Sequence, residues 1–152
     1  MFAFRIADAR HAIFSASGAM LHGGRWNSIG QPVIYAAETY AGALLEILAH
    51  ANLSSVPKNH RAVTITIPDQ ITIETLRPQD LPGWNLEDLT IPKNFGDRWI
   101  REGRSAVLRV PGVVTGGHER NVVFNPAHPD FTMISASEPE VVPWDRRLFR
   151  SR

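Results

Sequence analysis

The chain has 152 residues, of which 43% are hydrophobic and 20% are charged. This composition excludes a disordered polar chain, and the length suits one globular domain over residues 1–152. The formal net charge is only +1, which argues against a dedicated duplex-DNA-binding protein, because such a protein carries a basic stripe. No cysteine is present, so disulfides and Cys-ligated metal centres are excluded.

Targeting signals are also missing from the sequence. Residues 1–14 carry too many charges for the apolar core of a secretory signal, and no apolar run approaches the length of a membrane span. We therefore expect a cytoplasmic protein with no membrane partner and no direct nucleic-acid partner.

The first half of the chain is predicted to combine short strands with one long helix. Residues 2–6 are expected to form an opening strand, and residues 11–20, a mixture of Ser, Ala and Gly, are expected to form a loop. A Gly and Pro turn then leads into a short buried strand over residues 33–35. The helix that follows is predicted to run from about residue 39 to residue 51.

This helix carries a single acid on an otherwise apolar segment. Thr39 is expected to cap its N-terminus. Glu46 falls opposite the apolar stripe, and its neighbours one turn away are mostly small, so another element is expected to pack there. A partly buried carboxylate needs a partner, and a structural ion pair with Arg25 is one interpretation. The apolar stripe, which is expected to face the core, consists of Ala41, Leu44, Leu45 and Leu48.

Predicted strands dominate the second half of the chain. Apolar residues alternate with threonines over residues 61–67, the pattern of a half-buried strand. A long Pro- and Gly-rich loop over residues 78–92 is typical of a segment that covers a site. Asn94 is expected to cap a helix over residues 95–102, which Gly103 ends. This order of elements predicts an α+β fold with a mixed or largely antiparallel sheet and few helices. The further strands are expected at residues 71–76, 105–110, 121–124, 131–134 and 141–144.

The residue types around Arg25 predict an anionic ligand with a flat ring. Gly23 and Gly24 allow the backbone to approach a ligand closely, and Arg25 on that turn suits a phosphate group. Trp26 offers an aromatic face beside it. A carboxylate such as Glu46 stabilises developing positive charge, and a nicotinamide dinucleotide combines all three features. The histidines never occur as HxH or HExxH, so no metal site is predicted, and Walker A, GxGxxG and GxSxG motifs do not occur.

Two separated stretches of the chain resemble the RES-domain family, whose name refers to an arginine, a glutamate and a serine. One is GGRWNSIGQPVIYAAETYAGALLEIL, and the other is FGDRWIREGRSAVLRVPG followed by HERNVVFNPAHPDF. The resemblance implies a split sheet similar to that of ADP-ribosyltransferases. It also implies the toxin of a bacterial type II toxin–antitoxin module, which consumes NAD⁺ by hydrolysis or phosphorolysis or transfers ADP-ribose to a protein. The implied partner is an Xre-type helix-turn-helix antitoxin, and the resemblance allows a homodimer within the complex.

The resemblance assigns the family's functional residues to positions in this chain. The arginine falls at Arg25, the tyrosine at Tyr35 and the glutamate at Glu46. For the serine we take Ser105. Many relatives read VPS where residues 110–112 of this chain read VPG, so if the family's serine is the later one, either Ser105 substitutes for it or the activity is altered.

The reaction that the resemblance implies is cleavage of the bond between nicotinamide and ribose, through an oxocarbenium-like transition state. Arg25 would clamp a phosphate, and Glu46 would hydrogen-bond the ribose or counter the positive charge. Tyr35 would stack on or orient the nicotinamide ring, and Ser105 would contact the nicotinamide ribose or its amide. The residues predicted to bind NAD⁺, which is the substrate, are Arg25, Gly24, Trp26, Tyr35 and Asn121.

Two other classes of function remain open at the level of the sequence. A ribonuclease toxin would use His22 or His118 together with Glu46 as acid and base, and the lack of a basic patch argues against it. A non-catalytic partner-binding domain would need Arg25 and Glu46 only as a structural pair. RNA loss with intact NAD⁺ would indicate the first of these classes, and absence of toxicity would indicate the second.

Overall fold

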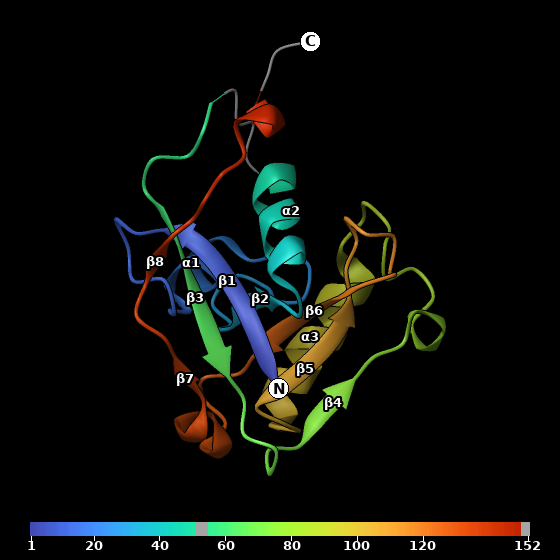
Figure 1. The fold of residues 1–152 in the computed structure, drawn as a ribbon. Helices are drawn as coiled ribbons and strands as arrows, with labels where there is room; N and C mark the ends of the chain where they lie inside the picture. The colour runs from blue at the N-terminus through green and yellow to red at the C-terminus, as the bar shows by residue number, and fades with distance from the viewer. Residues whose placement is uncertain (51–54, 150–152) are drawn as a thin grey trace.

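The computed structural model describes residues 1–50 and 55–149, which form one mixed sheet with three α-helices (Figure 1). The strand order is β4-β5-β6-β2-β1-β3-β7, and β8 also pairs with β3. Within the described residues only β4 and β5 run parallel. The predicted α+β fold is therefore confirmed. The strands are β1 (Phe2–Asp8), β2 (Ile34–Ala37), β3 (His60–Thr66), β4 (Ile73–Thr75), β5 (Val107–Pro111), β6 (Arg120–Phe124), β7 (Ser135–Ala136) and β8 (Glu140–Val141).

The helices differ in length and in how closely they follow the prediction. The predicted last residue of the first long helix, Ala51, lies outside the described residues. Over residues 1–50 and 55–149, no helix has the length and apolar character that crossing a membrane requires. The α-helices are α1 (Ser17–His22), α2 (Tyr40–His50) and α3 (Thr90–Glu102), and 3₁₀ turns occur at Pro78–Asp80, Pro129–Met133 and Arg146–Phe149.

The sheet is split between β1 and β2. These strands are in register at a single position, where Phe4 lies opposite Ala37, whereas β1 pairs with β3 along its whole length. The guanidinium of Arg5 crosses the split, donating from Nη1 to the Tyr35 carbonyl at 2.7 Å and from Nε to the Ile13 carbonyl at 2.6 Å. Two half-sheets therefore meet at an angle (Figure 1), and the half-buried, hydrogen-bonded side chain of Arg5 joins them.

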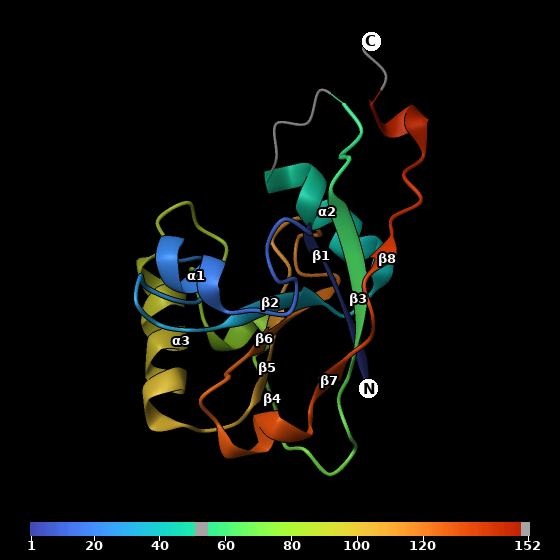
Figure 2. The same cartoon turned by 90° about the vertical axis from the view of Figure 1, so that its left-hand side faces the viewer.

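The central strands β2 and β6 carry helices at both ends of one face. Tyr35 lies opposite Val123 and Ala37 lies opposite Asn121, so these four residues share a face. Ala37 belongs to the apolar cluster under α2, and Val123 belongs to the one that contains Trp99 of α3. Figure 2 shows α2 and α3 well apart, with β2 and β6 running between them. The region between the two helices is where the candidate site lies.

The small-residue side of α2 lies closest to the sheet, and of the predicted stripe Leu44 packs, half-buried, against the apolar cluster under the helix. Gly42 and Ala43 are buried, whereas Ala41 is exposed and Leu45 is 41% exposed. The predicted core stripe is therefore wrong for Ala41 and Leu45. The reason is the close approach of the sheet, because a Cβ on Gly42 would lie only 3.3 Å from the Cβ of Ala37. The expectation that another element packs against the small residues around Glu46 is confirmed at Gly42 and Ala43 and is wrong at Ala49, which is exposed.

The second predicted helix begins earlier than expected, at Thr90 and not after Asn94. The Asp88 carboxylate accepts a hydrogen bond from the Thr90 N–H at 2.9 Å, which stabilises the first turn. Pro92 lies within that turn, where its missing N–H removes no helical hydrogen bond. Gly103 ends the helix with a φ of 58°, as predicted.

Two other segments have a different type of secondary structure from the one predicted. Residues 11–20 are not all loop, because α1 begins within them. The strand predicted over residues 131–134 is instead mostly the 3₁₀ turn Pro129–Met133. The side chain of His128 accepts a hydrogen bond from the Asp130 N–H at 3.1 Å, and proline at the first position presets the turn. Local capping therefore outweighs the apolar pattern at this segment.

Candidate functional site

Asn121 of β6 holds Glu46 of α2 against the centre of the sheet. Its Nδ2 donates a hydrogen bond to Glu46 Oε1 at 2.9 Å. Asn121 is itself fixed, because it lies opposite Ala37 of β2 and Val110 of β5. The acid that stood out in the sequence is therefore tied to a central strand rather than left on a solvated helix face.

His50 supplies the second partner of Glu46. Its Nε2 lies 3.1 Å from Glu46 Oε2, one helical turn further along α2. Burial by itself raises the pKa of Glu46, but hydrogen bonds from His50 and Asn121, together with the charges of His50 and Arg25, outweigh burial and hold the pKa below its usual value. The same pair raises the pKa of His50, chiefly through its hydrogen bond to Glu46. Glu46 is therefore ionised at neutral pH, and its side chain keeps 25% of its surface exposed.

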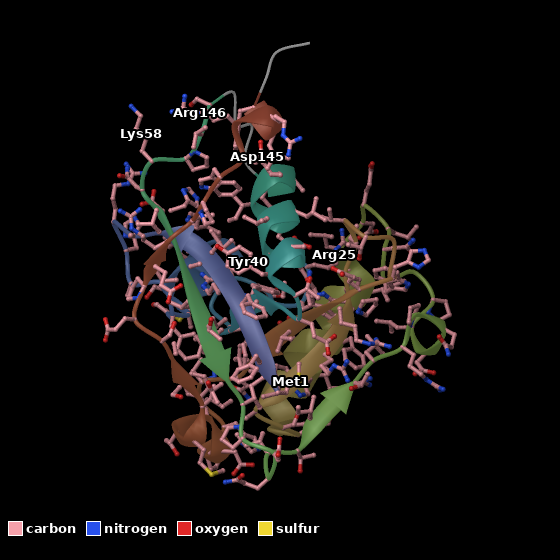
Figure 3. All side chains as sticks on the ribbon, in the orientation of Figure 1. Met1, Arg25, Tyr40, Lys58, Asp145 and Arg146 are labelled. Atoms are coloured by element: carbon pink, nitrogen blue, oxygen red, sulfur yellow. The ribbon has the colours of Figure 1, made fainter. Side chains whose placement is uncertain are left out.

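Arg25 lies near this acid without pairing with it. Its Nη1 donates to the carbonyls of Trp84, at 3.1 Å, and Leu86, at 2.8 Å. Among the described residues, Arg25 and Glu46 form no ion pair, yet the positive charge of Arg25 lowers the pKa of Glu46. Figure 3 places Arg25 beside α2. The structural ion pair considered from the sequence is therefore not formed, and Nε and Nη2 of Arg25 donate to no described residue.

Tyr35 supports the turn that presents Arg25. Its hydroxyl donates to Asn27 Oδ1 at 2.6 Å and accepts the Trp26 N–H at 3.0 Å. A Cβ on Gly24 would lie 2.7 Å from the Tyr35 hydroxyl, so only glycine allows this packing. Burial is the main reason that the pKa of Tyr35 is raised. The structure thus places Tyr35 under the Arg25 turn, with its hydroxyl fully engaged.

Two predicted site residues lie inside the protein. Trp26 is 3% exposed and packs edge-on against the ring of Phe95 of α3. Ser105 is 2% exposed, and its Oγ accepts a hydrogen bond from Trp99 Nε1 at 2.9 Å and donates one to the Val107 carbonyl at 2.8 Å. The structure does not bring either side chain to Glu46.

Two loops border Arg25 and Asn121. The segment of residues 81–89 supplies the carbonyls that Arg25 binds, and the ring of Trp84 in that segment lies against the loop between β5 and β6, where a Cβ on Gly117 would lie 3.2 Å from it. At the other end of this loop, a Cβ on Gly112 would lie 3.7 Å from Asn121 Oδ1. Figure 1 shows the two loops close together beside α2.

Several contacts at the site were not predicted from the sequence. The spacing of four residues between Glu46 and His50 is a signal that the sequence offered, since side chains at that spacing are neighbours on a helix. A second unpredicted contact joins Thr39 to Glu119, which lies in the family-like stretch HERNVVFNPAHPDF. The carbonyl partners of Arg25 left no signal, because any residue type supplies a backbone carbonyl.

Two surface hollows lie elsewhere on the molecule. One, of about 480 Å³, is lined on α3 by residues that include Phe95 and Arg98, and the other, of about 670 Å³, is lined by residues near the C-terminal end that include Trp144. Neither includes Arg25 or Glu46. The candidate site is therefore defined by side-chain contacts and charge. No group of three or more described residues is arranged to hold a metal ion.

Replacing His50 by glutamine is expected to raise the pKa of Glu46, because the substitution removes a positive charge beside that carboxylate and replaces a charged hydrogen-bond donor with a neutral amide. A carboxylate with a depressed pKa keeps its charge until the pH falls through the depressed value. For the NAD⁺ cleavage that the family resemblance implies, the acid limb of the pH profile of kcat/KM should therefore move to higher pH in His50→Gln. A limb that stays in place would show that His50 does not control Glu46.

The chain is similar to known proteins in family, in sequence and in fold. A model of the RES domain family matches residues 2–145. A protein of Sphingobium sp. named "Prs ADP-ribosylating toxin" is 38% identical over 140 residues, which cover 90% of this chain and 86% of that protein. A "Toxin Res" of Pseudomonas putida is 31% identical, covering 91% and 94%, and a "Toxin Res" of Yersinia enterocolitica is 33% identical, covering 97% and 99%.

A solved structure supports the same fold. The M. tuberculosis MbcT–MbcA toxin–antitoxin complex contains a chain that superposes with a TM-score of 0.74 at 20% identity, over 91% of this chain and 81% of that one. At this identity the likeness concerns the arrangement of helices and strands.

Proposed function

This chain belongs to the RES domain family, and from that membership we propose that it is a toxin that breaks the bond between nicotinamide and ribose in NAD⁺, with Arg25 and Glu46 as its central residues. The observation that carries the residue assignment is that Arg25 and Glu46 approach one region with opposite charges and do not neutralise each other. A purely structural pair would be in contact. Two separated charges suit a ligand with a negative diphosphate and a developing positive sugar.

Glu46 would act on the sugar. As the C1′–N bond lengthens, its electron pair moves to the nicotinamide nitrogen, which becomes neutral, and positive charge develops on the ribose. An ionised carboxylate near that charge stabilises the transition state more than the ground state, which is the requirement for catalysis. The partners Asn121 and His50 hold Glu46 ionised and fixed in orientation. Because nicotinamide is a good leaving group, no strong general acid is needed.

Arg25 would bind the diphosphate. Its Nη1 is committed to two loop carbonyls, which leaves Nε and Nη2 for an anion. The backbone of Gly24 lies at the same turn, and Tyr35 keeps that turn in place. Asn121 would contact the ligand from the sheet. The burial of Trp26 and Ser105 supports a packing role for both, one under the turn and one beneath α3.

The acceptor of the ADP-ribosyl group is the finer part of the proposal. Water, phosphate or a protein side chain would each bond to C1′ and release one proton. The Sphingobium relative is named for ADP-ribosylation of Prs, so purified Prs is the first protein acceptor to test. We expect an antitoxin partner, of the Xre helix-turn-helix type that the family resemblance implies, and the homodimer that it allows is tested by sizing the complex.

Arg25→Lys is expected to raise the KM for NAD⁺ about tenfold with little change in kcat. A lysine ammonium can still donate to the Trp84 or Leu86 carbonyl, but it lacks the second arm that would bind phosphate. Nicotinamide riboside, which has no phosphate, serves as the control substrate, and its cleavage should be equal in the two proteins. Equal losses on both substrates would assign Arg25 to loop structure and not to diphosphate binding.

One experiment tests the proposed function as a whole. The chain is expressed without an antitoxin while NAD⁺, RNA integrity and growth are followed together, and purified protein is then incubated with NAD⁺ to identify the released products. NAD⁺ loss, free nicotinamide and intact RNA are expected. RNA loss with constant NAD⁺ would indicate a ribonuclease, and unchanged growth, RNA and NAD⁺ would indicate a partner-binding domain.

A further inference from the structure

A short chain of hydrogen bonds connects the start of α2 to Glu119, the residue just before β6. The Gly42 N–H donates to Thr39 Oγ1 at 2.9 Å, and Thr39 Oγ1 donates in turn to Glu119 Oε2 at 3.0 Å. The Thr39 hydroxyl therefore caps α2 and also donates a hydrogen bond to a carboxylate on another segment.

The loop between β5 and β6 holds the backbone of Glu119 in place. Its N–H donates to Thr115 Oγ1 at 3.2 Å, and its carbonyl accepts the Gly112 N–H at 2.9 Å. Glu119 is only half buried. The two hydrogen bonds that its own N–H and carbonyl make across the loop fix its backbone in position. A carboxylate fixed in this way defines where the N-terminal turn of α2 can lie.

Packing confirms how closely Glu119 and α2 approach. A Cβ on Gly42 would lie 3.2 Å from Glu119 Oε2 and 2.9 Å from Thr39 Oγ1, so position 42 accepts only glycine without a shift. Gly42 lies one helical turn before Glu46, on the same side of the helix. Any movement that separates the first turn from Glu119 therefore also moves Glu46 relative to the sheet.

We propose that Glu119 is a positioning residue, which acts through the hydroxyl of Thr39 to fix α2 so that Glu46 meets Asn121. Residues 119 and 121 are separated by one position on the same segment, and each holds one turn of α2. Gly42 and Ala43 pack α2 against the sheet, and the two polar contacts from one segment then set where Glu46 lies along β6. The proposal rests on the function proposed for Glu46.

Two pairs of substitutions test it. Thr39→Val removes the hydroxyl at nearly constant shape, and Thr39→Ser retains it. Glu119→Ala removes the carboxylate but leaves the hydrogen bond from Gly42 to Thr39 intact, so the helix start is preserved, and Glu119→Gln retains an acceptor oxygen. Each conservative variant is the matched control for its partner.

Two readouts are needed, and one of them does not depend on catalysis. The nuclear magnetic resonance shifts of the Asn121 side-chain amide report whether Glu46 keeps its place on the sheet, because Asn121 Nδ2 donates to Glu46 Oε1. Thr39→Val and Glu119→Ala should move these shifts toward those of a Glu46→Ala protein, in which the amide has lost its acceptor, and they should reduce kcat about tenfold with the KM for NAD⁺ changed less than twofold. Thr39→Ser and Glu119→Gln should stay near the parent in both.

The outcomes separate the proposal from the function on which it rests. Equal Asn121 amide shifts in the disruptive and conservative variants would overturn the positioning role, and so would changed shifts with an unchanged kcat. If the parent protein consumes no NAD⁺, the proposed function fails, while the Asn121 amide shifts still decide whether Glu119 positions Glu46.

Discussion

Replacing Glu46 by glutamine is expected to reduce the rate of NAD⁺ cleavage roughly 10²- to 10³-fold while the protein remains folded. Glutamine has the same shape and keeps an oxygen that can accept the hydrogen bond from Asn121. What it lacks is the negative charge opposite the developing positive ribose. The effect should therefore appear in kcat, measured as nicotinamide release at saturating NAD⁺, with a small change in KM.

The matched control is Glu102→Gln, which makes the same change on another helix. Glu102 pairs with Arg104 at the C-terminal end of α3, so the substitution should leave NAD⁺ cleavage and growth inhibition unchanged. A Glu46→Gln protein that depletes NAD⁺ at the parent rate would remove the carboxylate from the mechanism, whatever the family membership implies.

Gly96→Ala is expected to cause the largest loss of stability of any glycine-to-alanine change in the described part of this chain. Gly96 is buried in α3, and a Cβ there would overlap the backbone carbonyl of Trp26. Because the obstacle is backbone and not the end of a flexible side chain, helix and loop must separate. We expect a loss of about 3 kcal/mol or more in the free energy of unfolding, seen as a drop of about 10 °C in the thermal midpoint.

Gly18→Ala provides the control for the intrinsic effect of the substitution. Gly18 lies in α1, and a Cβ there would meet no atom within 4 Å, so alanine should leave stability unchanged or raise it slightly. Because the clash at Gly96 is next to Arg25, a Gly96→Ala protein that remains folded should also show a raised KM for NAD⁺. A thermal midpoint equal to that of Gly18→Ala would show that α3 and the Trp26 loop are not in close contact.

The sequence predicts the strands well where alternation is strong and poorly where local hydrogen bonding decides. Residues 61–67 alternate clearly, and β3 forms there. Residues 131–134 have a similar apolar content, but the proline and the His128 cap before them favour a 3₁₀ turn. For α2 the predicted helical period is correct, but the face predicted to be buried is wrong at Ala41 and Leu45. The sheet approaches α2 so closely that side-chain size decides which face is buried more than hydrophobicity does.

The candidate site was predictable in its residue types but not in its connections. Arg25, Glu46 and Asn121 could be named from the sequence, and the structure brings them near each other. Ser105 could not be judged, because its engagement by Trp99 depends on how α3 packs against β5. Contacts such as Thr39 with Glu119 join positions that are 80 residues apart, and no periodicity within one segment reports them.

The Arg5 guanidinium, which spans the split in the sheet, offers a way to inhibit this toxin away from its active site. Tyr35 carries both the carbonyl that Arg5 binds and the hydroxyl that supports the Gly24 turn. Separating the two half-sheets would therefore also displace Arg25, the residue that we propose binds the diphosphate. An inhibitor or a neutralising protein that binds between β1 and β2 would therefore inhibit the enzyme without occupying the substrate-binding site.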